Sequence, residues 1–176
     1  GDYFASELLK SLGARAGDDA DVRSAMFRLI QSMDGDYYRA ESVKQVVGRR
    51  RLGAREMDFL VGVLPKMQSD YYKAEVLKSI LASGSVDAAH RKQLAVLAKD
   101  IHEDAYAFEF VKALANGDSG PGGARALIDA ASTIQSDYYL SEAVAAILAG
   151  PPLDERDLLA IVKTARANPS EYYRSE

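Results

Sequence analysis

The sequence predicts an all-α fold, an α-solenoid of about five two-helix repeats with a period of 34 residues. Three observations lead to this class. A motif of an acidic residue, an aromatic pair (a single tyrosine in one copy) and a glutamate recurs along the chain, the apolar residues between its copies follow helical spacing, and no segment alternates like a strand. The motif copies start at Asp2, Asp36, Asp70, Asp104, Asp137 and Glu171.

The stretch 69–103 illustrates how each repeat predicts two helices. Ser69 or Asp70 can cap the first helix, because a side-chain oxygen there accepts a free N–H of the first turn. The Ser83-Gly84-Ser85 segment ends that helix, and Asp87 caps a second one. The apolar stripes of the two helices are Val76, Leu77, Ile80 and Leu81, and then Leu94, Leu97, Ala98 and Ile101.

Equivalent positions of successive repeats form apolar columns, which predict one continuous core. A single helix pair cannot bury its apolar face alone, so stability is expected from the stacking of neighbours. Residues 1–176 are therefore expected to form a single helical repeat domain, cut from a longer array. The columns are Leu9, Val43, Leu77, Val111 and Val144; Leu12, Val46, Ile80, Leu114 and Ile147; Met26, Leu60, Leu94, Leu127 and Ile161; and Ile30, Leu64, Ala98, Ala131 and Ala165.

Composition excludes several classes of function. The chain is 48% hydrophobic and 27% charged, which is typical of a globular domain, and no apolar run is long enough for a membrane-spanning helix. The net charge of −4 does not favour a nucleic-acid partner. The chain has no cysteine, and His90 and His102 are expected on the solvated surface. We therefore expect no metal, no cofactor and no direct insertion into a membrane.

The motif also places a tyrosine, a glutamate and a lysine on one helical stripe, since residues i, i+4 and i+7 share a face. Stacked repeats would turn this stripe into a groove for an extended peptide or a helix. The alternative is a ladder that only joins neighbouring repeats. The second aromatic residue of each pair is assigned to the edge of the core. The candidate partner-binding residues on the stripe are Tyr37, Glu41, Lys44, Tyr71, Glu75, Lys78, Tyr138 and Glu142.

The fourth repeat departs from the pattern. Ala105 replaces the first tyrosine, while Phe108 and Phe110 enlarge positions that are small or aliphatic elsewhere. These two phenylalanines are either an aromatic hot spot for a partner or a size exchange in which Ala105 makes room for Phe108. The segment Gly117–Gly123 lacks the lysine and the preceding strand of a phosphate-binding loop, so it predicts a turn between helices that shortens the following helix.

No combination of side chains predicts catalysis. The chain lacks a cysteine nucleophile, and the repeated glutamates are too alike for one pair to be tuned as acid and base. The first hypothesis is thus a non-enzymatic protein-interaction or scaffold module with a protein or peptide partner. The alternatives are a purely structural spacer, a regulatory appendage of an envelope enzyme, and a domain that binds a small ligand or a glycan.

The repeats resemble known helical repeats. Their period matches that of tetratricopeptide repeats, but that family's tryptophan is missing, and the looser HEAT-type repeats are more similar. The phrase Ser69-Asp70-Tyr71-Tyr72-Lys73-Ala74-Glu75-Val76-Leu77 resembles repeats appended to bacterial BlaR-type membrane metallopeptidases. The resemblance implies a periplasmic or extracytoplasmic location, with the cytoplasm left open. Because the peptidase's His-Glu-x-x-His motif is missing from this sequence, the resemblance implies no peptidase activity.

Overall fold

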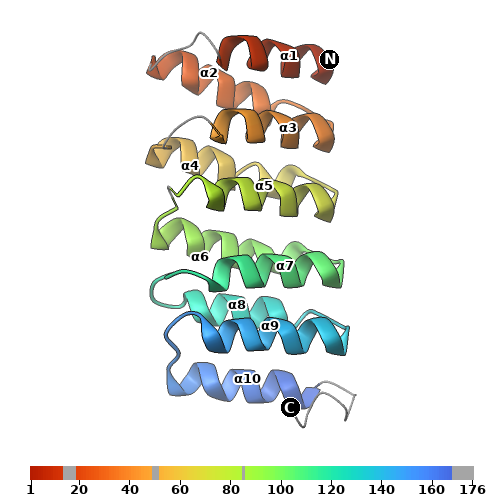
Figure 1. The fold of residues 1–176 in the computed structure, drawn as a ribbon, viewed down its shortest axis with the longest axis vertical. Coiled ribbons are helices and arrows are strands. Elements are labelled where there is room, and N and C mark those ends of the chain that lie inside the picture. Colours follow the sequence, from red (N-terminus) through yellow and green to blue (C-terminus); the bar gives the residue numbers. More distant parts are fainter. Residues whose placement is uncertain (14–18, 49–51, 85, 168–176) are drawn as a thin grey trace. The chain divides into compact units, whose positions relative to one another are not determined.

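The structure is a computed structural model that describes residues 1–13, 19–48, 52–84 and 86–167. Within these ranges the regular structure consists of ten α-helices and two 3-10 helices, with no strand (Figure 1). This confirms the all-α class. The chain divides into two compact units, Gly1–Val86 and Asp87–Glu176, and each unit is described by itself. The sixth motif copy, at Glu171, lies outside the described residues.

The first unit consists of two layers of helices. Helix α1 packs against α3 and α3 against α5, while α2 packs against α4 (Figure 1). The apolar columns face the interior, and Leu9, Ile30 and Leu60 are buried. The helices of this unit are α1 (Asp2–Gly13), α2 (Ala20–Gln31), α3 (Asp36–Val47), α4 (Ala54–Val61), the 3-10 helix η1 (Leu64–Lys66) and α5 (Asp70–Ala82).

The second unit follows the same order of contacts. Helix α7 packs against α9, and α8 packs against α6, α7, α9 and α10. Leu114, Leu127 and Ile147 are buried in its interior. The helices of this unit are α6 (Ala88–Leu97), the 3-10 helix η2 (Ala98–Asp100), α7 (Asp104–Ala115), α8 (Gly123–Ala131), α9 (Asp137–Ala149) and α10 (Glu155–Ala167).

The helix boundaries agree with the expected stop signals, but one of the expected side-chain caps does not form. Helix α5 ends at Ala82, and Gly84 adopts a left-handed φ of 65° just after it. Asp87 caps α6 by accepting a hydrogen bond of 2.9 Å from the N–H of His90. Ser69 occupies the N-cap position of α5, yet its side chain makes no capping hydrogen bond. None of the described helices is both long and apolar enough to cross a lipid bilayer.

Two further expectations can be compared with the structure. His90 is buried, with its Nδ1 2.8 Å from Asp87 Oδ1, so the expectation that it lies on the solvated surface is wrong. Because α6 begins at Ala88, His90 lies in its first turn, where the cap can hold the imidazole. Helix α8 has nine residues, which is fewer than the twelve of α2 but more than the eight of α4, so its length does not single out the preceding turn. Gly120 and Gly122 have positive φ in this turn, which explains the choice of glycine there.

Candidate functional site: the repeated motif face

The aspartate that opens the motif binds the backbone of the next motif copy. Asp36 Oδ2 accepts hydrogen bonds of 2.7 Å from the N–H groups of both Gln68 and Ser69, the two residues that precede α5. Hydrogen bonds to a carboxylate are shorter and stronger than neutral ones. The motif aspartate therefore joins one repeat to the next. Asp2 binds Asp34 and Gly35 in the same way, and Asp104 binds Gln135 and Ser136.

In the first unit, two buried basic side chains form ion pairs with motif aspartates. Arg39 pairs with Asp36 at 3.1 Å and donates a second hydrogen bond of 3.1 Å to the carbonyl oxygen of Lys66. Lys73 takes the same place in α5 and pairs with Asp70 at 3.0 Å. Both side chains are buried. Sequence reasoning did not single them out, although each is a basic residue three positions after a motif aspartate.

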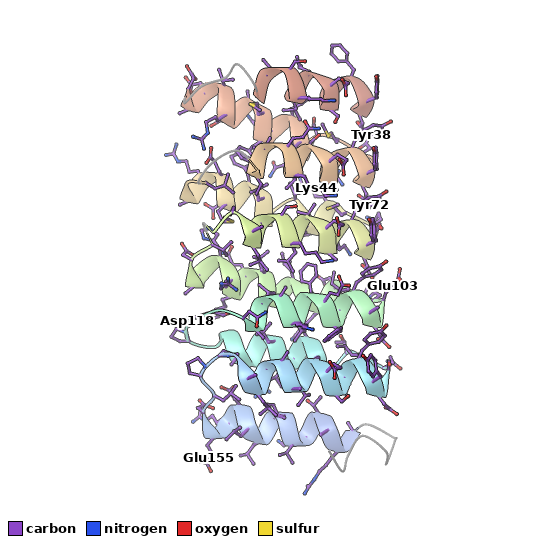
Figure 2. The ribbon with its side chains drawn as sticks, viewed as in Figure 1. Tyr38, Lys44, Tyr72, Glu103, Asp118 and Glu155 are labelled. Carbon is purple, nitrogen blue, oxygen red and sulfur yellow. The ribbon has the colours of Figure 1, made fainter. Side chains whose placement is uncertain are left out.

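The motif tyrosines of the first unit form a row of edge-to-face contacts. Tyr37 lies 5.1 Å from Tyr38 of its own pair and 6.2 Å from Tyr72 of the next pair, measured between ring centroids. Tyr71 continues the row at 5.0 Å from Tyr72, and Tyr3 begins it at 6.4 Å from Tyr38. Figure 2 shows Tyr38 and Tyr72 at the same end of α3 and α5. The row thus crosses three helices.

The two tyrosines of each pair differ in exposure. The first ring is 53% exposed at Tyr37 and 46% at Tyr71, and it is also exposed at Tyr3. The second ring, at Tyr38 and Tyr72, is only half-buried and supports the exposed ring of the preceding copy. From here on, the name tyrosine row refers only to the three exposed first tyrosines, Tyr3, Tyr37 and Tyr71.

A chain of ion pairs runs beside the tyrosine row. Lys44 Nζ lies 3.0 Å from Glu41 in α3 and 3.1 Å from Glu75 in α5, so this lysine joins the two helices (Figure 2). Lys78 extends the chain at 3.6 Å from Glu75. The structure therefore joins Glu41, Lys44, Glu75 and Lys78 in one chain of ion pairs, and it joins Tyr37 and Tyr71 through their contacts with Tyr72. It also assigns Lys44 and Glu75 a contact between repeats, as expected for a joining ladder.

The ion pairs shift two pKa values. Hydrogen bonding to Lys44 is the main cause of a lowered pKa at Glu75, and it outweighs the opposing effect of burial. Partial burial alone would lower the pKa of Lys44, but its hydrogen bonds to Glu41 and Glu75 together raise it. Both shifts favour the charged forms.

In α7, where Ala105 replaces the first motif tyrosine, Phe108 supplies an aromatic ring. Phe108 stacks on Tyr139 at 5.7 Å between ring centroids, whereas Tyr37 meets Tyr72 edge to face at 6.2 Å in the first unit. Lys112 Nζ lies 5.3 Å from the centre of the Phe108 ring. One helical turn separates Ala105 from Phe108, so the ring lost at the first position is supplied from the next turn. This geometry favours the size exchange.

The remaining candidates are divided between core and surface. Phe110 is 1% exposed, so we assign it to the core and remove it from the candidate surface. Tyr138 is exposed on α9 and contacts Tyr139 at 5.2 Å, and Glu142 is exposed on the same helix. These two residues belong to the second unit. The contact between Tyr138 and Tyr139 repeats the one between Tyr37 and Tyr38, but Ala145 takes the place of Lys44.

Comparison of the chain with known protein families, characterised proteins and solved structures finds no match. The resemblance to metallopeptidase-associated repeats therefore stays a prediction. Among the described residues, no three His, Cys, Asp or Glu side chains gather in a way that could hold a metal ion.

Proposed function

We propose that the chain is an α-solenoid of about five two-helix repeats that acts as a protein-interaction or scaffold module, with the tyrosine row as its binding surface. The single observation that carries the proposal is that the rings of Tyr37 and Tyr71 are exposed while each also packs edge to face on the second tyrosine of its own pair. Tyrosine is enriched at binding hot spots, and a side chain that is already ordered loses little entropy on binding.

The repeat arrangement is supported by contacts that recur at equivalent positions. Asp2 and Asp36 make the same pair of hydrogen bonds to successive motif copies, and Asp104 makes them in the second unit. The edge-to-face contact between Tyr3 and Tyr38 recurs between Tyr37 and Tyr72. Equal spacing in sequence thus corresponds to equal chemical surroundings, as a stack of repeats requires.

The spacing of the tyrosine row favours an extended peptide as the ligand. Packed helices lie roughly 8–10 Å apart, so the tyrosines of α1, α3 and α5 are expected at about that interval. A polyproline II peptide returns to the same face every three residues, a rise of about 9 Å. The peptide would lay one apolar side chain on each tyrosine, while Glu41, Lys44 and Glu75 set its register.

The test is a selection of binding peptides on the folded chain. Peptides from a random display library are selected on the wild type, and their Kd is then measured for a Tyr37→Ala, Tyr71→Ala variant. We expect the affinity to fall at least about tenfold. Val96→Ala, which alters an exposed apolar residue of α6, is the matched control and should bind like the wild type. Equal affinity of the wild type and the double variant would rule out the tyrosine row.

A purely structural spacer is the second candidate, and Lys44 favours it. This lysine bridges two helices, and Asp36 is likewise used between repeats. In a spacer the tyrosine variant would lower the stability of the array without affecting any ligand, and the selection would enrich no peptide. Binding of a small ligand or glycan, and a regulatory role beside an envelope metallopeptidase, stay predictions.

A further inference from the structure

The turn between α7 and α8 lies against two basic side chains of α6. Lys92 Nζ is 3.3 Å from the position that a Cβ would take on Gly122, so the ammonium group lies against this glycine. The guanidinium of Arg91 lies against Gly117, at the start of the same turn, and donates a hydrogen bond of 3.4 Å to the carbonyl oxygen of Leu114. Within the described residues, neither basic side chain pairs with a carboxylate. The turn therefore has two positive charges beside it that are not used in ion pairs.

The turn leads into α8 without a side-chain cap. Its N-cap residue, Gly122, has no side chain and adopts a left-handed φ of 77°. The N–H of Gly123 donates to the carbonyl oxygen of Gly120. The next two N–H groups, of Ala124 and Arg125, have no acceptor in the part of the chain that the structure describes. Free N–H groups at a helix start and the positive end of the helix dipole both favour an anion.

A buried hydroxyl group in the turn points independently to a ligand. Ser119 is 1% exposed, and its Oγ makes no hydrogen bond within the described residues. Buried polar atoms without a partner are rare, because their lost hydration is not replaced. The Oγ lies 3.4 Å from the position of a Cβ on Gly123, so the hydroxyl is close to the first residue of α8. Asp118, the acidic residue of the turn, accepts the N–H of Gly120 at 2.7 Å (Figure 2).

We propose that this turn binds a phosphate group, either as inorganic phosphate or as the phosphate of a small phosphomonoester. Lys92 donates to one phosphate oxygen and the free N–H groups of α8 donate to others, while Ser119 gains an acceptor. Arg91 adds a second positive charge at the start of the turn. The lysine that the sequence of the turn lacks is thus supplied by α6.

The turn has room for such a ligand and for its substituent. Ser119 is closed to solvent in the free chain, so the turn has to open slightly to admit the phosphate, and four glycines among residues 117–123 permit this. Pro121 and Gly122 are exposed, which leaves the substituent of an ester in solvent. The site lies wholly in the second unit and shares no residue with the tyrosine row. It is therefore independent of the proposed peptide binding.

Calorimetric titration of the folded chain with inorganic phosphate, at an ionic strength held constant with chloride, tests the site. Lys92→Gln should weaken phosphate binding at least about tenfold, because a charged hydrogen-bond donor is lost. Lys163→Gln, at an exposed lysine of α10, removes the same charge elsewhere in the second unit and should bind like the wild type. A wild type that does not bind phosphate would overturn the proposal. Equal affinities of the two variants would also overturn it, since they indicate an adventitious ion only.

Ser119→Ala separates a role in binding from a role in folding. Because the Oγ has no partner in the free chain, its removal should leave the melting temperature unchanged or raise it when phosphate is absent. The same change should weaken phosphate binding about fivefold. Unchanged phosphate binding, or a melting temperature that falls without phosphate, would contradict the proposal.

Titration with glycerol phosphate then distinguishes the two sources of the phosphate group. We expect it to bind the wild type about as tightly as inorganic phosphate does, and to lose the same affinity in Lys92→Gln. Binding of inorganic phosphate without binding of glycerol phosphate would support the site and identify the free ion as its ligand. Binding of glycerol phosphate that Lys92→Gln does not weaken would overturn the proposal.

Discussion

The carboxylate of Asp36 explains why the motif begins with an acidic residue. It accepts two backbone N–H groups that would otherwise lack a partner at the start of α5, and it also pairs with the buried Arg39. Aspartate has a short side chain, so few rotatable bonds are fixed when it makes these contacts. The motif aspartate thus begins a helix and also makes the contact between successive motif copies.

Replacement of Asp36 tests this role. Asp36→Ala should lower the free energy of unfolding by about 1.5–3 kcal/mol, because hydrogen bonds to a charged group are lost and two N–H groups lose their acceptor. Asp36→Asn keeps an acceptor and should cost less. Urea denaturation at neutral pH measures both. Asp34→Ala, at an exposed position nearby, is the control and should change stability by less than about 0.5 kcal/mol. Equal losses for Asp34→Ala and Asp36→Ala would contradict this account.

Sequence reasoning located the motif but not the partners of its residues. Asp87 was predicted as a cap and is one, since its partner His90 lies three residues away. Ser69 was also predicted as a possible cap, yet the acceptor at that helix start is Asp36, which is 33 residues distant. Such a contact depends on how two repeats pack. Local spacing therefore predicts short-range hydrogen bonds well and does not reveal contacts between repeats.

At the scale of elements, the ion pairs of Lys44 hold α3 beside α5. The lowered pKa of Glu75 stabilises the folded protein at pH values above the pKa that this carboxyl has in the unfolded chain. This stabilisation is lost as the pH falls through the pKa of Glu75 in the folded state. The raised pKa of Lys44 stabilises the folded protein at pH values below the pKa that this lysine has in the unfolded chain. This stabilisation is lost as the pH rises through the pKa of Lys44 in the folded state. The pair therefore contributes most to the free energy of unfolding between the unfolded-state pKa of Glu75 and the unfolded-state pKa of Lys44.

A double-mutant cycle of Lys44→Gln and Glu75→Gln measures this contribution. At neutral pH we expect a coupling free energy of about 0.5–1 kcal/mol, the upper part of the range for exposed pairs. In acid well below the ordinary glutamate pKa of 4.5 the coupling should vanish. The pair Glu7–Lys10, 3.8 Å apart and more exposed, is the matched control and should show almost none. A coupling that persists in acid would show that the charges are not its cause.

The α7 helix shows where prediction by element reaches its limit. The sequence left open whether Phe108 and Phe110 are a hot spot or part of a size exchange. The two residues prove to differ, since Phe108 stacks on Tyr139 and Phe110 is buried. Their spacing of two residues turns them about 200° apart around a helix, so one can face the core only if the other does not. Which of the two turns inward depends on how α7 packs against its neighbouring helices.

At the scale of the whole molecule, the helical class and the buried columns were predictable because they follow from one period repeated along the chain. Leu60, Leu94 and Leu127, which belong to one predicted column, are all buried. The role of the motif face was less accessible, because a tyrosine that binds a partner and one that joins repeats obey the same spacing. The structure adds that Tyr37 is exposed and Tyr38 half-buried, a contrast that the spacing alone does not predict.

The central claim is that residues 34 positions apart occupy equivalent places, and removal of one complete period tests it most directly. Deletion of residues 36–69 joins Gly35 to Asp70 and keeps the motif in register. The shortened chain should keep its helicity per residue and unfold cooperatively in urea, with an m-value about one fifth smaller. Deletion of α3 alone, which breaks the register, should abolish cooperative unfolding. Loss of cooperative unfolding in the full-period deletion as well would contradict the account.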